Sequence, residues 1–186
     1  TVIAVNDAPV ASAGTVTTSE DTDYSGTLMA SDGDGDALTY SVLTDPVNGT
    51  ISITSSSSGT YTYSPTANYN GSDSLTFTAS DGTLLDTAKV SITVTAVNDA
   101  PVASAGTVTT NEDTDYTGTL SASDVDGDAL TYSVLTSPVN GTIAITSSSS
   151  GTYTYSPTAN YNGSDSFVYS VSDGTLSDNA TVSITV

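Results

Sequence analysis

The chain is one sequence unit written twice, and this internal repeat limits its fold more than any other feature. Asn-Asp-Ala-Pro-Val at 6–10 returns at 98–102, 92 residues later (98 − 6). Tyr-Asn-Gly-Ser-Asp-Ser at 69–74 returns at 161–166 with the same spacing. A repeat of this length in 186 residues predicts two structural units, which we place at 1–97 and 98–186. Because the chain begins and ends partway through the joining motif, we expect it to be a piece of a longer array.

Apolar residues alternate with Ser and Thr along most of each unit, which is the pattern of half-buried β-strands. Turn dipeptides such as Asn48-Gly49 and Asp81-Gly82 separate the alternating segments, and no segment has a helical period. In the last segment Val90 and Ile92 are expected to point inward and Lys89 outward. The expected strands of the first unit are 8–17, 24–30, 38–43, 49–54, 60–64, 74–80 and 87–97. Seven short strands in about 92 residues predict an all-β protein of two tandem, seven-stranded, Greek-key sandwiches of immunoglobulin type.

The charge composition excludes several classes of function. The chain has 21 acidic residues against one basic residue, Lys89, and no Arg, His or Cys, which gives a formal net charge of −20. A single cation cannot neutralise nucleic-acid phosphates or attract the chain to anionic lipid. Without His or Cys there is no Ser-His-Asp triad, Cys nucleophile or zinc finger, so a metal would be held by oxygen alone. No apolar run approaches the ~20 residues of a membrane span, so we expect no membrane insertion.

The acids are concentrated in loops, and strand order predicts which loops share an end of a unit. Successive strands run in opposite directions, so alternate loops lie at opposite poles. This places acids of the lower pole of the first unit, the joint and the upper pole of the second unit around one junction. The predicted junction set is Glu20, Asp21, Asp73, Asn98, Asp99, Asp124, Asp126, Asp128 and Asp173. Like charges about 4 Å apart repel by roughly 4 kcal/mol at an effective dielectric of 20. Six to eight oxygen ligands is the requirement of calcium, so we predict a Ca²⁺-clamped joint.

The sharpest local motif is Asp-x-Asp-Gly-Asp, at Asp32–Asp36 and again at Asp124–Asp128. It is not an EF-hand loop, because the sixth position is Ala37 and the twelfth is Leu43. The alternative interpretation is an acidic, solvated turn that keeps the protein soluble. The remaining acids form two sites that lack a neighbouring unit. These are Asp7, Asp32, Asp34, Asp36 and Asp81 at the upper pole of the first unit, and Glu112, Asp113 and Asp165 at the lower pole of the second.

Taken in order, the motifs resemble the bacterial cadherin-like tandem repeats of very large secreted or surface-bound adhesins, many of which carry RTX-type export signals. The residues that carry the resemblance are Asn98-Asp99-Ala100-Pro101, Glu112-Asp113-Thr114, the Asp124–Asp128 loop with Leu130-Thr131-Tyr132, Asn140-Gly141-Thr142 and Tyr161-Asn162-Gly163-Ser164-Asp165-Ser166. By analogy with animal cadherins, the resemblance implies calcium ligands at Asn98, Asp99, Glu20, Asp124 and Asp126. The chain lacks the Leu-Asp-Arg-Glu segment of cadherins, and Asp73 is the candidate for its place.

Two functions from different classes follow. The first is a calcium-rigidified spacer at the bacterial surface or in a secreted adhesin, whose partners are the neighbouring repeats and whose role is adhesion or biofilm attachment. The second is a calcium-dependent binding module for polysaccharide or for another copy of itself, which would need an exposed aromatic patch or an edge strand bearing apolar side chains. Val168, expected to point outward, is the one residue that favours it. A glycoside-cleaving enzyme is the third and weakest reading, because the paired carboxylates lie on exposed loops.

Overall fold

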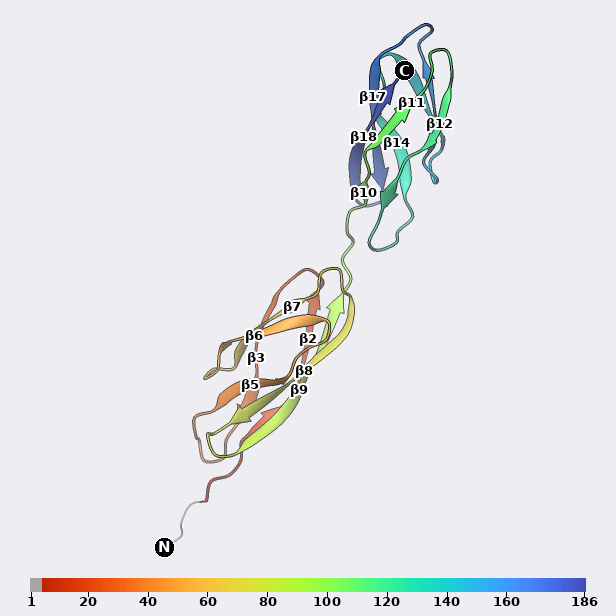
Figure 1. Ribbon diagram of the computed structural model, residues 1–186. Coiled ribbons are helices and arrows are strands. Elements are labelled where there is room, and N and C mark those ends of the chain that lie inside the picture. Colours follow the sequence, from red (N-terminus) through yellow and green to blue (C-terminus); the bar gives the residue numbers. More distant parts are fainter. Residues whose placement is uncertain (1–4) are drawn as a thin grey trace. The chain divides into compact units, whose positions relative to one another are not determined.

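The computed structural model describes residues 5–186, and the chain divides into two compact units, Thr1–Val97 and Asn98–Val186 (Figure 1). All regular secondary structure over the described residues is β-strand. Each unit is a sandwich of a four-stranded and a three-stranded sheet, with a two-stranded ribbon beside them. Over residues 5–186, no helix is long and apolar enough to cross a membrane.

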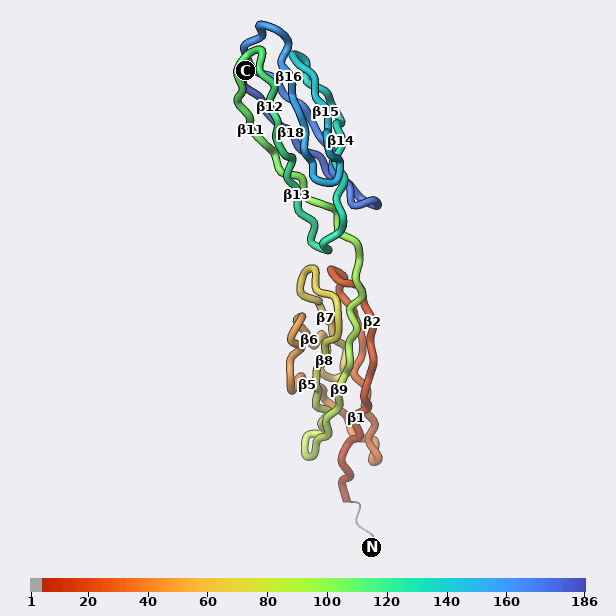
Figure 2. Tube along the Cα trace, turned by 90° about the vertical axis from the view of Figure 1, so that its right-hand side faces the viewer, coloured from red at the N-terminus to blue at the C-terminus, as the bar shows by residue number. Residues whose placement is uncertain are grey.

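The strands of the first unit are β1 (Val10–Ser12), β2 (Gly14–Ser19), β3 (Tyr24–Thr27), β4 (Met29–Ser31), β5 (Thr39–Thr44), β6 (Gly49–Ser55), β7 (Thr60–Pro65), β8 (Gly71–Ser80) and β9 (Leu85–Thr95). The four-stranded sheet has the order β2-β9-β8-β5, the three-stranded sheet the order β3-β7-β6, and β1 pairs with β4. Neighbouring strands are antiparallel except β2 and β9, which are parallel. Figure 2 shows β5 and β6 on one side of the unit and β2 on the other.

The second unit repeats this arrangement. Its strands are β10 (Val102–Ala103), β11 (Gly106–Thr109), β12 (Tyr116–Thr119), β13 (Ala122–Ser123), β14 (Thr131–Thr136), β15 (Gly141–Ser147), β16 (Thr152–Pro157), β17 (Ser164–Ser172) and β18 (Ser177–Thr185). The sheets have the orders β11-β18-β17-β14, β12-β16-β15 and β10-β13. The expected all-β, Ig-like sandwich is therefore confirmed in both units.

The first two expected strands differ from the structure, because each is split in two. The segment 8–17 breaks at Ala13, so that β1 pairs with β4 while β2 crosses to the other sheet and pairs with β9. The segment 24–30 breaks at buried Leu28, whose amide donates to the carbonyl of Gly59 at 2.9 Å. Gly59 has a φ of +70°, and a Cβ there would lie 2.8 Å from the Leu28 carbonyl oxygen. A hydrophobic pattern does not reveal either change of partner. The alternation of burial continues through Leu28, and at Ala13 it shifts by one residue among small side chains that give no clear pattern.

The core of each unit lies between its two sheets and follows the expected alternation. In β9 Val90, Ile92 and Val94 are buried while Lys89 is exposed. Tyr63 and Phe77 are completely buried in the first unit, as their equivalents Tyr155 and Tyr169 are in the second. Burying a large apolar side chain contributes about 1.5–3 kcal/mol, so these rings and aliphatic chains supply most of the stabilising free energy.

Asp73 is a buried carboxylate at the start of β8, and the protein itself satisfies it completely. Its Oδ1 accepts the amides of Val47 at 3.0 Å and Ser74 at 2.8 Å. Its Oδ2 accepts the amide of Asn48 at 2.9 Å and the hydroxyl of Tyr63 at 3.0 Å. Burial raises the pKa of Asp73, but these four donors outweigh burial and leave its pKa below the ordinary value of 3.8. Asp73 thus fixes the loop between β5 and β6 to the core.

Asp165 repeats this arrangement in the second unit. Its two oxygens accept the amides of Val139, Asn140 and Ser166 and the hydroxyl of Tyr155. Burial, and then the hydrogen bond to Asp165, raises the pKa of Tyr155 to about 12. A carboxylate has about four lone-pair sites, so neither Asp73 nor Asp165 has one left over for an ion.

We expect Asp73→Asn to lower the free energy of unfolding of the first unit by about 2–3 kcal/mol, because the new amide group would face donors such as the Tyr63 hydroxyl. Asp45→Asn, an exposed change in the same loop, is the control and should have almost no effect. Because the pKa of folded Asp73 is lowered, its contribution is complete above about pH 4 and is lost as the pH falls through that lowered pKa. Denaturant unfolding between pH 7 and pH 3 measures both effects. Equal stabilities of the two variants at pH 7 would contradict this role.

Candidate metal site at the pole of each unit

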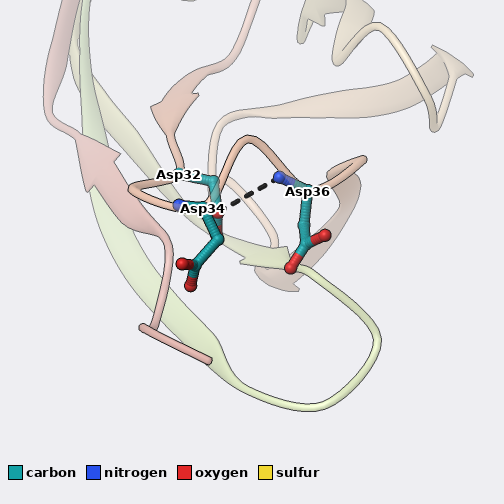
Figure 3. A group of neighbouring side chains, drawn as sticks. All are labelled: Asp32, Asp34 and Asp36. Atoms are coloured by element: carbon teal, nitrogen blue, oxygen red, sulfur yellow. Dashed lines mark hydrogen bonds between the residues drawn. The ribbon is translucent and has the colours of Figure 1, made fainter. Parts of the chain in front are cut away.

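The Asp-x-Asp-Gly-Asp loop between β4 and β5 is closed by its own first residue. Oδ1 of Asp32 accepts the amides of Asp34 at 2.9 Å and Asp36 at 3.2 Å (Figure 3). This is the local side-chain to backbone bonding that Asp favours in turns. Gly35 has a φ of +80°, which a residue with a side chain would adopt only with strain. The loop therefore curls around the Asp32 carboxylate.

This closure brings three carboxylates together in each unit. One oxygen from each of Asp32, Asp34 and Asp36 lies within 4.8 Å of the other two. Asp124, Asp126 and Asp128 form the same group in the second unit, with Oδ1 of Asp124 accepting the amides of Asp126 at 3.0 Å and Asp128 at 3.2 Å. No basic side chain stands beside either group, since Lys89 is the one cation and lies on the outer face of β9. The repulsion within each group would be relieved by a cation.

The segment that precedes each unit is bonded to the same pole. In the second unit the Asp99 amide donates to Oδ2 of Asp126 at 2.8 Å, and Nδ2 of Asn98 donates to Oδ2 of Asp173 at 2.8 Å. In the first unit the Asp7 amide donates to Oδ2 of Asp34 at 2.7 Å, and Asn6 donates to Asp81 at 2.8 Å. The Asn-Asp pair is thus part of the unit that follows it.

Asp173 closes the turn between β17 and β18 and also orients Asn98. Its Oδ1 accepts the amides of Thr175 at 2.6 Å and Leu176 at 2.7 Å, while its Oδ2 holds the Asn98 amide group. The Asn98 side chain, followed by these two backbone amides, lowers the pKa of Asp173. Asp81 has the same contacts in the first unit with Thr83, Leu84 and Asn6, and its pKa is lowered as well.

The second oxygen of the first aspartate in each loop is the feature that best fits a cation-binding site. Oδ2 of Asp32 and Oδ2 of Asp124 are shielded from solvent, and neither has a hydrogen-bond partner among the described residues. Buried polar atoms are almost always paired, and an unpaired charged oxygen costs several kcal/mol of stability. A cation bound at these atoms would remove that cost. The donors are all oxygen, so they fit a hard cation such as Ca²⁺.

The acids at the lower poles are arranged differently. Glu20 is 2% exposed and its Oε1 accepts the amide of Val97 at 2.6 Å. Asp21, at a φ of 56°, accepts the amide of Asn68 at 3.0 Å. Together with Asp73, these acids bind backbone amides of their own unit. Over residues 5–186, the two loops already described are the groups of three acids close enough to hold one ion.

The lower pole of the second unit follows the same plan. Asp113 accepts the amide of Asn160 at 2.9 Å, Asp165 has its four donors, and Glu112 is exposed. The structure thus brings together Asp32, Asp34 and Asp36, with Asp7 and Asp81 beside them, and their equivalents in the second unit. It does not gather Glu20, Asp21 and Asp73, or Glu112, Asp113 and Asp165, into a cluster. The junction clamp that would unite acids of both units stays a prediction.

Sequence reasoning missed Asn6, which bonds to Asp81 as Asn98 does to Asp173. The 92-residue repeat could have revealed it, because Asn98 was identified and Asn6 is its equivalent. It also missed Asp86 and Asp178, whose Oδ2 atoms accept the amides of Ala11 and Ala103 at 2.9 Å. No sequence pattern marks these two acids, because their partners lie 75 residues away.

Comparison with solved structures identifies the fold. The EC1-2 fragment of human protocadherin-24 is 17% identical, with a TM-score of 0.62, and the match covers 96% of this chain and 99% of that one. The EC1-3 fragment of mouse protocadherin-24 is 17% identical, with a TM-score of 0.55 and coverage of 96% and 70%. An endo-fucoidan hydrolase of glycoside hydrolase family 107 is 30% identical, with a TM-score of 0.45. That match covers 96% of this chain, which spans only 28% of the hydrolase.

No curated protein sequence matches the chain. The sequence profile described as "Bacterial Ig domain" matches it twice, at residues 6–93 and 98–185. These two matches coincide with the two structural units, whose strands have the cadherin-like arrangement. The chain therefore belongs to the bacterial Ig domain family and consists of two consecutive cadherin-like units.

Proposed function

We propose that the two units are calcium-rigidified extender repeats of a large bacterial adhesin, surface-bound or secreted, that supports cell adhesion or biofilm attachment outside the cell. The observation that carries this proposal is the shielded, unpartnered Oδ2 of Asp32 and of Asp124. Each lies in an acidic loop to which the joining segment of its unit is bonded. An ion bound there would act on the joint itself, and this is where a spacer needs stiffness.

The donors of the second unit account for part of a calcium shell. Asp124, Asp126 and Asp128 supply carboxylate oxygens within 4.8 Å of one another, and Asn98 and Asp99 are bonded beside them. Calcium takes six to eight oxygens. In the proposed junction the remainder come from water and from Glu20 and Asp21 of the preceding unit. Asp73 and Asp165 are left out of the proposed shell, because their oxygens are occupied.

The joint has little backbone left to bend. The amide of Val97 is bonded to Glu20 of the first unit, and the amide of Asp99 is bonded to Asp126 of the second. Pro101, which is buried, fixes one further φ angle. We therefore assign the remaining flexibility to the few bonds between Val97 and Asp99, where a bound calcium ion would restrict it.

Calcium should raise the melting temperature of the chain, because an ion that binds only the folded state stabilises it by mass action. Extracellular calcium modules bind with dissociation constants of about 10⁻⁴–10⁻³ M, so a few millimolar calcium should be sufficient. Calorimetry in calcium and in chelator measures the effect, with magnesium as the comparison ion. Identical melting curves in calcium and chelator would refute the calcium proposal.

Asp124→Asn should abolish the calcium response of the second unit while leaving its fold intact. Asparagine keeps an Oδ1 for the amides of Asp126 and Asp128, so the loop closes, but it replaces the unpartnered oxygen with an amide group. In chelator the variant should melt at the wild-type temperature or slightly higher, because repulsion falls. Asp115→Asn makes the same charge change at an exposed position and is the control. If both variants keep the full response to calcium, Asp124 is not a ligand.

Calcium should also narrow the range of orientations between the two units. The chain has no Cys, so Ser91→Cys and Ser183→Cys provide unique spin-label sites on exposed positions of β9 and β18. Pulsed electron resonance should give a broad distance distribution in chelator and a narrow one in calcium. Sodium chloride screens the repulsion but cannot replace a directional clamp, so it should not imitate calcium. Equally broad distributions in all three conditions would mean that calcium does not stiffen the joint.

A further inference from the structure

Strand β6 is an open edge of the first unit. Within the described residues its one hydrogen-bonded neighbour is β7, and the other side of the strand has no partner. Seven residues long, it is the longest of the edge strands β2, β3, β5 and β6. Strand β15 has the same position in the second unit, with β16 as its neighbour.

The register with β7 shows which backbone groups point away from the sheet. The amide of Thr66 donates to the carbonyl of Asn48, so these two residues face each other as a hydrogen-bonded pair. Along an antiparallel ladder, such pairs alternate with pairs that are not hydrogen-bonded. Thr50 and Ser52 therefore bond toward β7, while the N–H and C=O groups of Ile51 and Ile53 point outward from the edge. The register shift lies after Ile53, so this part of the strand is regular.

This edge has little of the usual protection against pairing. Natural sheets protect exposed edges with charges, proline, β-bulges or very short strands, and of these β6 and β15 have one, the register shift that follows Ile53 and Ile145. The chain has 21 acidic residues, yet β6 (Gly-Thr-Ile-Ser-Ile-Thr-Ser) and β15 (Gly-Thr-Ile-Ala-Ile-Thr-Ser) contain no charge and no proline. Val47, which is 87% exposed, lies in the loop just before β6 that Asp73 holds in place, and exposed Leu43 lies near the end of β5. Strand β6 is thus uncharged and has exposed apolar side chains beside it on a strongly acidic protein, with Asp45 the one charged residue of the preceding loop.

The sequence of the edge is self-complementary. Residues 50–54 read Thr-Ile-Ser-Ile-Thr in both directions, and residues 142–146 read Thr-Ile-Ala-Ile-Thr in both directions. A two-fold interface places the same surface of both copies together, so its residues must match themselves. With Ser52 opposite Ser52, Thr50 faces Thr54 and Ile51 faces Ile53. Threonine pairs of this kind are favourable across strands, and no like charges meet.

We propose that this edge pairs antiparallel with the same edge of a second copy of this chain, β6 with β6 or β15 with β15, joining the three-stranded sheets of the two molecules edge to edge. In this register Ile51 and Ile53 of each copy exchange their outward backbone groups, so both pairs are hydrogen-bonded pairs. The contact contains no carboxylate and is independent of calcium. It would connect extender chains laterally.

Sedimentation of the full chain in chelator tests the proposal, because calcium bridging between acidic poles is then absent. We expect a weak monomer–dimer equilibrium that strengthens with sodium chloride, since salt screens the repulsion between two chains of net charge −20. A chain that remains monomeric up to about 1 mM, a concentration that would reveal even millimolar association, overturns the proposal.

Paired substitutions test the location and the register. Ser52→Asp with Ala144→Asp places like charges opposite each other and should weaken dimerisation about tenfold or more. Ser25→Asp with Thr117→Asp adds the same charge to exposed positions on β3 and β12, the opposite edges of the same sheets, and should have little effect. Circular dichroism and melting temperature establish that each variant is folded. If the two double variants behave alike, the dimer does not use β6 and β15.

Charge exchange gives the decisive comparison. A chain with Ser52→Lys and Ala144→Lys should also be a poor homodimer, but mixing it with the aspartate variant should restore association, because lysine then faces aspartate. Failure of the mixture to associate overturns the two-fold register. These results are separable from the calcium proposal, because a dimer in chelator and a calcium-dependent melting temperature can each occur without the other.

Discussion

Both units depend on hydrogen bonds that backbone amides donate to carboxylate oxygens. The chain has 21 acids and a single lysine, so side-chain cations cannot neutralise the acids, and hydrogen bonds from peptide N–H groups stabilise many of the charged carboxylates instead. Asp73 fixes the loop before β6, Asp81 closes the turn between β8 and β9, and Asp86 holds Ala11 of β1. The pKa values of all three are lowered, because bonds from amides stabilise the charged form.

The same interaction separates the acids that build the fold from those that are able to bind an ion. Asp73 and Asp165 use every lone pair on donors of the protein, so they are structural despite lying near a predicted site. In Asp32 and Asp124, one oxygen accepts the backbone amides that close the loop, and the other is shielded from solvent and has no hydrogen bond. Whether a carboxylate can bind a metal ion therefore depends on how many hydrogen-bond donors its oxygens already have. Proximity to other acids predicts metal binding less well.

Much of this organisation could be predicted from the sequence, because it depends on regular spacing. The alternation of apolar and polar residues predicted the strands and the outward position of Lys89. Because successive strands run in opposite directions, the strand order predicted that Asp7 and Asp34 lie at the same pole. The split of the first strands and the occupation of Asp73 could not be predicted, because both depend on hydrogen-bond partners distant in sequence. Val47 lies 26 residues before Asp73, and Ala11 lies 75 before Asp86. A periodic pattern says which way a side chain points but not which amide reaches its oxygen.

The bonding of the Asn-Asp pair to the unit that follows it also bears on how such a chain can change length during evolution. Asn98 and Asp99 are held by Asp173 and Asp126, so a gene segment that starts at the Asn codon and encodes one repeat carries every residue that its own upper pole requires. Duplication or deletion of whole 92-residue segments (98 − 6) in this frame leaves the pole of every remaining copy intact. A breakpoint a few codons later would separate the pair from its acids. The length of an array can therefore vary by recombination between copies without compensating mutations at the joints.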